Sequence, residues 1–154
     1  MEFADFHAIQ NLVYSYPYLL DAGDFDGVGR LFADAVVYSG GALMASRDAA
    51  AVARAFRDWV ITYDDGTPRT RHCLCNLIIM PDGPDRATAK SYVMVFQQTA
   101  HLPLQPVIGG DYADRFEKRD GVWRFVERRM GNDQFGILLA HGRDPGIFTP
   151  MRVN

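Results

Sequence analysis

Two residues of this sequence, Asp21 and His72, have side chains that could together perform acid–base chemistry. Asp21 ends an amphipathic segment near the start of the chain, and His72 stands in a segment that reads as a strand. A carboxylate that bonds to an imidazole fixes the tautomer of the ring and stabilises its protonated form. The histidine then becomes a positioned general base, which can remove a proton from a substrate. Asp21 and His72 are therefore the candidate catalytic pair, provided that the fold brings them together.

Each of the two residues also has a plain structural interpretation. A histidine on a strand is more often a hydrogen-bonded core residue or a surface residue than a base. An aspartate in an Asp-Ala-Gly-Asp turn is commonly solvated, although a carboxylate near a helix C-terminus interacts unfavourably with the helix dipole. The catalytic interpretation therefore depends on the elements that carry the two side chains.

The first part of the chain has the periodicity of helices. Apolar residues recur there at three- and four-residue steps, and turn residues interrupt them. The pattern predicts helices over residues 5–22, 25–33 and 47–62. Pro17 predicts a kink in the first helix because it lacks a backbone donor, and Asp24 and Ser46 are the expected N-caps of the other two.

The rest of the chain has the composition of an antiparallel sheet. Strands are predicted over residues 36–38, 71–80, 87–98, 108–119 and 122–130, with a break after the first at Gly40-Gly41. The Asp120-Gly121 dipeptide predicts a hairpin between the last two strands. Helices followed by antiparallel strands indicate the α+β class rather than a parallel α/β sheet. A curled sheet with helices across its concave face would hold an apolar pocket, where the end of the first helix can meet the middle of a strand.

Alternation along the strand predicts what surrounds His72. Thr70, Leu74, Asn76 and Ile78 are expected on the same face, and this mixed set suits the polar end of a cavity. Cys73 and Cys75 fall on the opposite face in a poor geometry for bridging each other, so we expect reduced thiols.

Size and charge narrow the function further. A length of 154 residues predicts one domain over residues 1–154, large enough to enclose a pocket. A net charge of −3 argues against nucleic acid as the main partner. No apolar run approaches the roughly 20 residues that span a bilayer, and the N-terminus does not resemble a signal peptide. We therefore expect a cytoplasmic protein with no membrane partner.

Other candidate residues have weaker support. His7, His101 and His141 are expected to meet water, the first on an exposed helix face and the others in loops that contain proline or glycine. Arg128, in a Glu-Arg-Arg triplet, is ordinarily a surface cation. No nucleophile-elbow sequence, phosphate-binding glycine loop or dinucleotide fingerprint occurs, so serine hydrolysis and nucleotide chemistry have no support.

Three stretches of the sequence resemble a known family. They are residues 18–26 with 31–34, the triplet Thr70-Arg71-His72, and residues 108–112 with the hairpin of residues 116–125. On these stretches the chain, to about residue 145, resembles the SnoaL-like branch of the nuclear transport factor 2 superfamily. Scytalone dehydratase, hexachlorocyclohexane dehydrochlorinase and bile acid 7α-dehydratase belong to the same group. The resemblance implies a cone-shaped barrel of a curved, mostly antiparallel sheet, with N-terminal helices packed over its concave face.

The resemblance also implies roles for individual residues. Asp21 matches the aspartate that orients the base, and His72 matches the histidine that removes a proton. Tyr16, Tyr38 and Arg128 match residues that bind or polarise the substrate in one or another of these enzymes. A lysine of the dehydrochlorinase is absent, which argues against halide elimination. The second active-site histidine of scytalone dehydratase has no firm equivalent.

Taken together, the residues and the resemblance predict a lyase of the dehydratase type that needs no metal or organic cofactor. Its substrate would be small, cyclic and mostly apolar. An isomerase or cyclase with the same base, or a non-catalytic ligand-binding module, remains open. We also expect a homo-oligomer, either a trimer or a dimer, because the convex face of such a sheet needs covering. The irregular tail of residues 131–154 is expected to cover the pocket.

Overall fold

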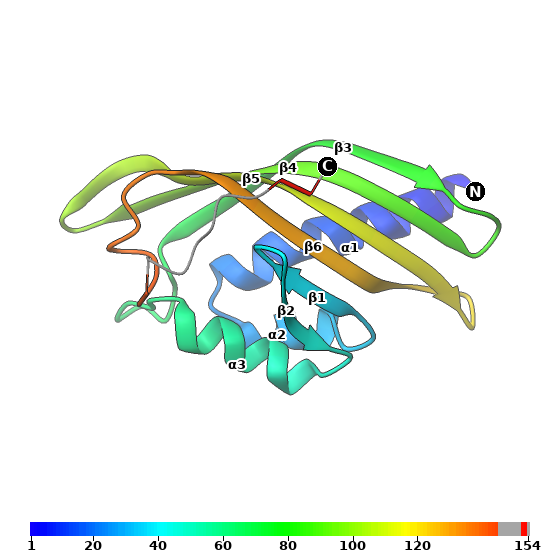
Figure 1. Ribbon diagram of the computed structural model, residues 1–154, viewed down its shortest axis with the longest axis horizontal. Coiled ribbons are helices and arrows are strands. Elements are labelled where there is room, and N and C mark those ends of the chain that lie inside the picture. The colour runs from blue at the N-terminus through cyan, green and yellow to red at the C-terminus, as the bar shows by residue number, and fades with distance from the viewer. Residues whose placement is uncertain (145–151, 154) are drawn as a thin grey trace.

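Three helices lie against one face of a six-stranded sheet in the computed structural model (Figure 1). The structure describes residues 1–144, 152 and 153. The helices are α1 (Phe3–Asp21), α2 (Phe25–Leu31) and α3 (Ala49–Trp59). The strands are β1 (Val36–Ser39), β2 (Ala42–Ser46), β3 (Thr70–Pro81), β4 (Arg86–Thr99), β5 (Leu102–Arg119) and β6 (Val122–Phe135). The prediction of an α+β fold is confirmed.

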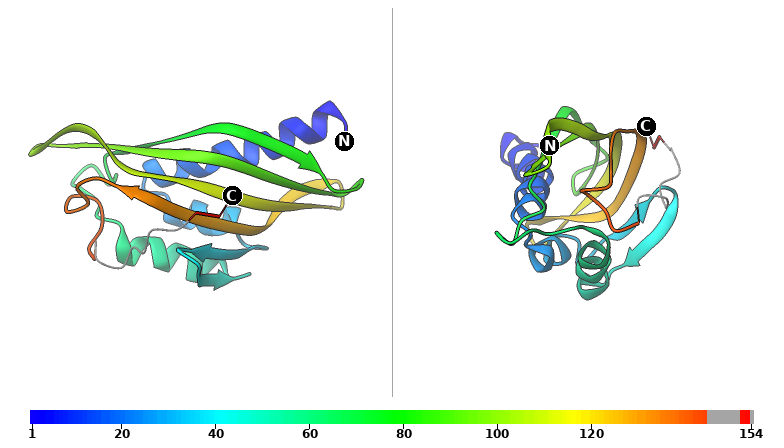
Figure 2. Two further views of the ribbon diagram at one scale, coloured as in Figure 1. Left: turned by 45° about the horizontal axis from the view of Figure 1, so that its top comes forward. Right: turned by 90° about the vertical axis from the view of Figure 1, so that its left-hand side faces the viewer.

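The sheet is curved but does not close. Its strand order is β2-β1-β6-β5-β4-β3, with β1 parallel to β6 and every other pair antiparallel. The end-on view in Figure 2 shows the sheet curling around the side on which the helices lie. The sheet is therefore open and strongly bent, with β2 and β3 at its edges, and does not form a complete barrel.

Helix α1 forms because its apolar residues recur on one side. Ile9, Val13, Tyr16 and Leu20 are buried, and the helix is continuous through Pro17. The Asp24 carboxylate accepts a hydrogen bond from the backbone N–H of Gly27 and caps α2, as predicted. Because one side of α1 packs against the core, its last residue, Asp21, lies against strand β3.

The region between β1 and α3 differs from the prediction. Gly40 and Gly41 adopt positive φ angles of 55° and 79°, so they make a tight turn that leads into β2 rather than ending the strand region. Ser46 is the last residue of β2, and α3 is capped by Asp48, whose carboxylate accepts from the backbone N–H of Ala51. The expected cap at Ser46 was therefore wrong by two residues.

Strand β3 contains a bulge that strict alternation does not foresee. Its pairing with β4 shifts between Cys75 and Ile78, and Asn76 has a φ of 54°. Beyond the bulge Leu77 packs against the core, while Asn76 and Ile78 are exposed. Only the part of β3 before the bulge keeps the predicted face.

The C-terminal region is more ordered than predicted. Strand β6 continues to Phe135, so residues 131–135 belong to the sheet and not to the predicted irregular tail. The expected pocket cover falls partly on residues 145–151 and 154, which lie outside the described residues. In the described part of the chain, no helix combines the length and apolar character that crossing a bilayer requires.

Candidate functional site

A cavity of about 490 Å³ opens between the concave face of the sheet and the helices. This volume lies within the range of small-molecule sites. Most of its wall is apolar, with side chains that include Leu20, Phe56, Trp59, Val95, Ile108 and Met130. Its polar side chains are Tyr16, Ser39, Thr70, His72, Tyr112, Asn132 and His141. The cavity is thus suited to a mostly apolar molecule that carries a few polar atoms.

The structure brings Asp21 and His72 into contact. Oδ1 of Asp21 lies 2.6 Å from Nδ1 of His72 and accepts a hydrogen bond of 2.7 Å from the Thr70 hydroxyl. Oδ2 of Asp21 accepts a hydrogen bond of 2.8 Å from the backbone N–H of His72. The carboxylate therefore fixes both the ring and the backbone of the histidine at the start of β3.

Electrostatics assign the proton between the two side chains. Burial raises the pKa of Asp21, but the hydrogen bonds from His72 and Thr70 and the charge interaction with His72 outweigh it, so the pKa falls below its ordinary value. An ionised carboxylate only accepts hydrogen bonds, so Nδ1 of His72 carries a proton. Nε2 is then the nitrogen through which His72, a cavity-lining side chain that is 6% exposed, can take a proton from a ligand.

Two tyrosines form a neutral hydroxyl pair beside this histidine. The Tyr16 ring lies edge-on to the His72 ring at 6.2 Å, and its hydroxyl interacts with that of Tyr112. Burial raises the pKa of Tyr112 to about 12 and that of Tyr16 well above its ordinary value. Both hydroxyls therefore keep their protons at neutral pH. The structure places Tyr16 in the cavity, together with Tyr112, which was not among the predicted site residues.

Arg128 lies below the cavity rather than on its surface. Its guanidinium is fully buried, makes two hydrogen bonds of 2.7 Å to Asp114, and lies 4.7 Å from the ring centres of both Tyr16 and Tyr112. It does not line the cavity. The burial corrects the surface interpretation, and the position of Arg128 does not support a direct contact with substrate. From this position Arg128 can act on a ligand through the two tyrosines.

Tyr38 does not lie in the cavity either. The neighbouring residue Ser39 lines the cavity, whereas the Tyr38 ring packs beneath the Arg129 guanidinium at 4.2 Å. The short strand β1 runs parallel to β6 with Tyr38 opposite Arg129, and this register decides the packing. The expected polarising role of Tyr38 is therefore not supported by its position.

A second histidine, His141, also lines the cavity. His101, at the turn between β4 and β5, is exposed as predicted. His7, in α1, is exposed too, as predicted. His141 was expected to meet water but is 4% exposed and lines the cavity. In the apolar run Ile137-Leu138-Leu139-Ala140 before it only Leu138 is buried, while Ile137 and Leu139 are exposed, so the sequence carries no clear signal for His141.

Comparisons with known proteins agree with this architecture. A family model described as the SnoaL-like domain matches residues 1–129. A search among curated proteins finds no similar sequence.

Solved structures with the same fold include three from two organisms. A variant of a protein of unknown function from Mycobacterium tuberculosis is 27% identical over 96% of this chain and 79% of that chain, with a TM-score of 0.70. A protein provisionally named scytalone dehydratase from Novosphingobium aromaticivorans is 22% identical, with coverages of 95% and 96% and a TM-score of 0.68. A provisionally named β subunit of an aromatic-ring-hydroxylating dioxygenase from the same organism is 20% identical, with coverages of 91% and 98% and a TM-score of 0.67.

Proposed function

Because the chain belongs to the SnoaL-like domain family, we propose that its cavity is the active site of a lyase that removes water from a small, cyclic, mostly apolar substrate. The family and the cavity support a catalytic or binding role on small molecules. The finer proposal is carried by one observation, the bonding of Asp21 to the His72 side chain that lines the cavity. Such a pair has the parts of a positioned general base.

The proposed reaction begins at Nε2 of His72. This nitrogen takes a proton from a substrate carbon that a neighbouring carbonyl makes acidic. The electron pair of the C–H bond forms a double bond, the bond from the adjacent carbon to its hydroxyl breaks, and the leaving group takes the proton from the imidazolium to depart as water. Asp21 stabilises the imidazolium in the interval between the two transfers.

The tyrosine pair supplies the second requirement, stabilisation of negative charge on oxygen. A neutral hydroxyl from the Tyr16–Tyr112 pair can donate to the carbonyl oxygen as charge develops there. The Arg128 guanidinium beneath both rings favours this polarised state without touching the substrate. Oriented donors of this kind are worth several kcal/mol in a site that excludes water.

The test is turnover by the His72→Gln variant. With a panel of apolar cyclic β-hydroxyketones as substrates, we expect wild-type protein to release water and the variant to be slower by roughly 10²–10⁴-fold. His101→Gln is the matched control, because His101 is exposed and does not line the cavity, and it should retain full activity. Undiminished turnover by a folded His72→Gln protein would contradict the mechanism.

An isomerase or cyclase with the same base is the alternative within enzymes. Since Asp21 and His72 only move a proton, they fit either outcome, and product mass separates them. Loss of water supports the lyase, and an unchanged mass supports isomerisation. A wild-type protein that binds the panel but changes none of it would instead be a ligand carrier.

A further inference from the structure

His141, a residue that lines the cavity, has a polar atom that the proposed reaction does not use. Nδ1 of His141 is buried and finds no hydrogen-bond partner within the described residues. A buried polar nitrogen without a partner costs free energy, on the order of 1–3 kcal/mol. Because His141 lines the cavity, a bound molecule could supply the missing bond.

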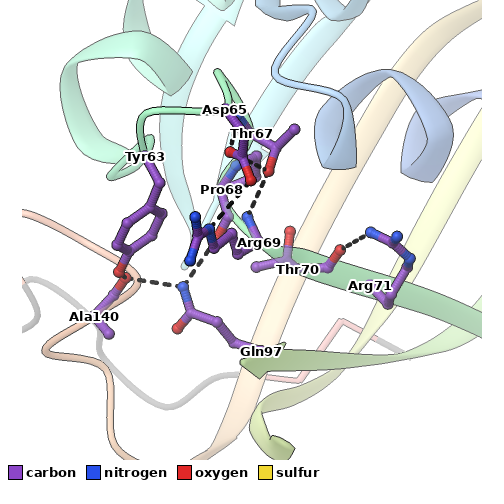
Figure 3. A network of polar contacts seen from close by, with 9 residues as sticks. All are labelled: Tyr63, Asp65, Thr67, Pro68, Arg69, Thr70, Arg71, Gln97 and Ala140. Carbon is purple, nitrogen blue, oxygen red and sulfur yellow. Dashed lines mark hydrogen bonds and ion pairs between the residues drawn. The ribbon is translucent and has the colours of Figure 1, made fainter. Parts of the chain in front are cut away.

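The segment that carries His141 is held firmly in place. The carbonyl of Ala140 accepts hydrogen bonds from the Tyr63 hydroxyl at 2.7 Å and from the Gln97 side chain at 2.8 Å (Figure 3). The same Gln97 amide bonds to the carbonyl of Pro68 at 3.0 Å. These bonds join the segment after β6 to strand β4 and to the loop before β3, so His141 is preorganised.

The ring itself is also oriented. The imidazole ring of His141 lies edge-on to the Trp59 ring, with 5.2 Å between the ring centres. The backbone carbonyl of His141 accepts a hydrogen bond from the N–H of Ile61. His141 therefore approaches the cavity from the end of α3, whereas His72 approaches from β3 and the tyrosine pair from α1 and β5. Polar groups on different walls can contact different atoms of one ligand.

The charge state of His141 defines what it can recognise. Burial, and to a lesser extent the nearby His72, lower its pKa to about 4. A neutral imidazole has one N–H donor and one acceptor nitrogen, and it can exchange them by changing tautomer. It is suited to an uncharged hydroxyl or carbonyl oxygen rather than to a carboxylate or phosphate.

We propose that His141 is a substrate-binding residue that hydrogen-bonds a second neutral oxygen of the ligand, distinct from the oxygen held by the Tyr16–Tyr112 pair. The substrate class is then an apolar ring compound with oxygen functions at two positions. This inference rests on the proposed function only for the location of the site. A ligand that lacks the second oxygen leaves Nδ1 of His141 unpaired and binds more weakly.

The test measures binding rather than turnover, so it separates this inference from the proposed reaction. The probes are 2-naphthol and the dihydroxynaphthalenes that add one hydroxyl to its second ring, titrated calorimetrically. We expect at least one dihydroxy isomer to bind wild-type protein about tenfold more tightly than 2-naphthol, as one hydrogen bond predicts. The His141→Phe variant, which keeps the aromatic contact with Trp59, should lose this gain and bind 2-naphthol unchanged.

Two further variants make the result specific. His101→Phe is the matched control, since His101 is exposed and does not line the cavity, and it should keep the tenfold gain. If His141→Phe does not fold, His141→Leu answers the same question. The proposal is overturned if no dihydroxy isomer binds more tightly than 2-naphthol, or if the gain persists without His141.

Discussion

At the residue scale, the Asp21 carboxylate has a proposed catalytic role and a structural role. These two roles decide which variant is the better test of catalysis. It bonds to the His72 ring, but it also bonds to the His72 backbone and to the Thr70 hydroxyl. Removing its charge therefore disturbs the junction of α1 and β3 as well as the base. His72→Gln keeps the backbone bond, which makes it the cleaner probe of catalysis.

The buried His141 predicts how stability depends on pH. Its pKa of about 4 lies below the ordinary value near 6.5, so the unfolded chain binds a proton that the folded protein excludes. Stability is therefore lost as pH falls from about 6.5 towards 4. Between pH 7 and pH 4 this single group should remove roughly 3 kcal/mol of unfolding free energy.

Urea unfolding of wild type and His141→Phe at both pH values isolates that effect. Asp21 and His72 both face His141 electrostatically, but they are present in both proteins and largely cancel in the difference. The difference in unfolding free energy between the two proteins should shift in favour of the variant by about 3 kcal/mol at the lower pH. If the difference did not depend on pH, folding would not lower the pKa of His141.

Arg128 and Asp114 should behave as a coupled buried pair. Arg128→Met leaves an unpaired carboxylate in the core, and we expect a loss of about 3–5 kcal/mol in unfolding free energy. The double variant Arg128→Met, Asp114→Leu should recover a large part of that loss because no buried charge remains. Denaturant titration of the two variants measures the coupling, and equal losses in both would contradict it.

The sequence predicted the Asp21–His72 contact and the nearby Thr70 and Tyr16, but not the positions of Arg128, Tyr38 and His141. Periodicity placed Asp21 at a helix end and His72 on a strand, and the family resemblance implied that the two meet. Arg128, Tyr38 and His141 were misplaced because their surroundings depend on sheet register and on packing between distant segments. Tyr38 packs against Arg129 through the pairing of β1 with β6, which no local pattern encodes.

At the scale of elements, the start of α3 offers a direct comparison of two candidate caps. Asp48→Ala removes the acceptor for the N–H of Ala51 and should lower the unfolding free energy by about 1 kcal/mol. Ser46→Ala, at the position that the sequence favoured, should change it by less than about 0.5 kcal/mol. Thermal unfolding of both variants checks the prediction, which fails if Ser46→Ala has the larger effect.

The predictions for the Gly40-Gly41 region and for strand β3 were wrong for the same physical reason. A pair of glycines ends a strand in one context and turns it into a hairpin in another, and only the partner strand decides between them. In β3 the bulge at Asn76 depends in the same way on pairing with β4. Local propensity predicted that strands exist in both places, while their register came from non-local hydrogen bonds.

At the scale of the whole molecule, the fold class and the order of most elements followed from periodicity. The expectation of a homo-oligomer, a dimer or a trimer, stays a prediction. It draws support from Ile78, Met80 and Tyr92, which are exposed apolar side chains on the adjacent strands β3 and β4.

Sedimentation velocity tests that assembly. We expect wild-type protein to sediment as a dimer or trimer and the variants Ile78→Glu and Tyr92→Glu to shift towards monomer, because a buried charge opposes association. Val122→Glu is the matched control, since Val122 is equally exposed but lies at the β5–β6 turn. A monomeric wild-type protein would contradict the prediction.

The outward orientation of Cys73 provides a natural attachment point for a spectroscopic label. This thiol is free and exposed, and it is bonded directly to the residue whose ring faces the cavity from the other side of β3. A small fluorophore or spin label attached to it would sense small shifts of that strand while leaving the interior untouched. Occupancy of the interior could then be followed spectroscopically in the natural sequence, with Cys75 two residues along as a second attachment point.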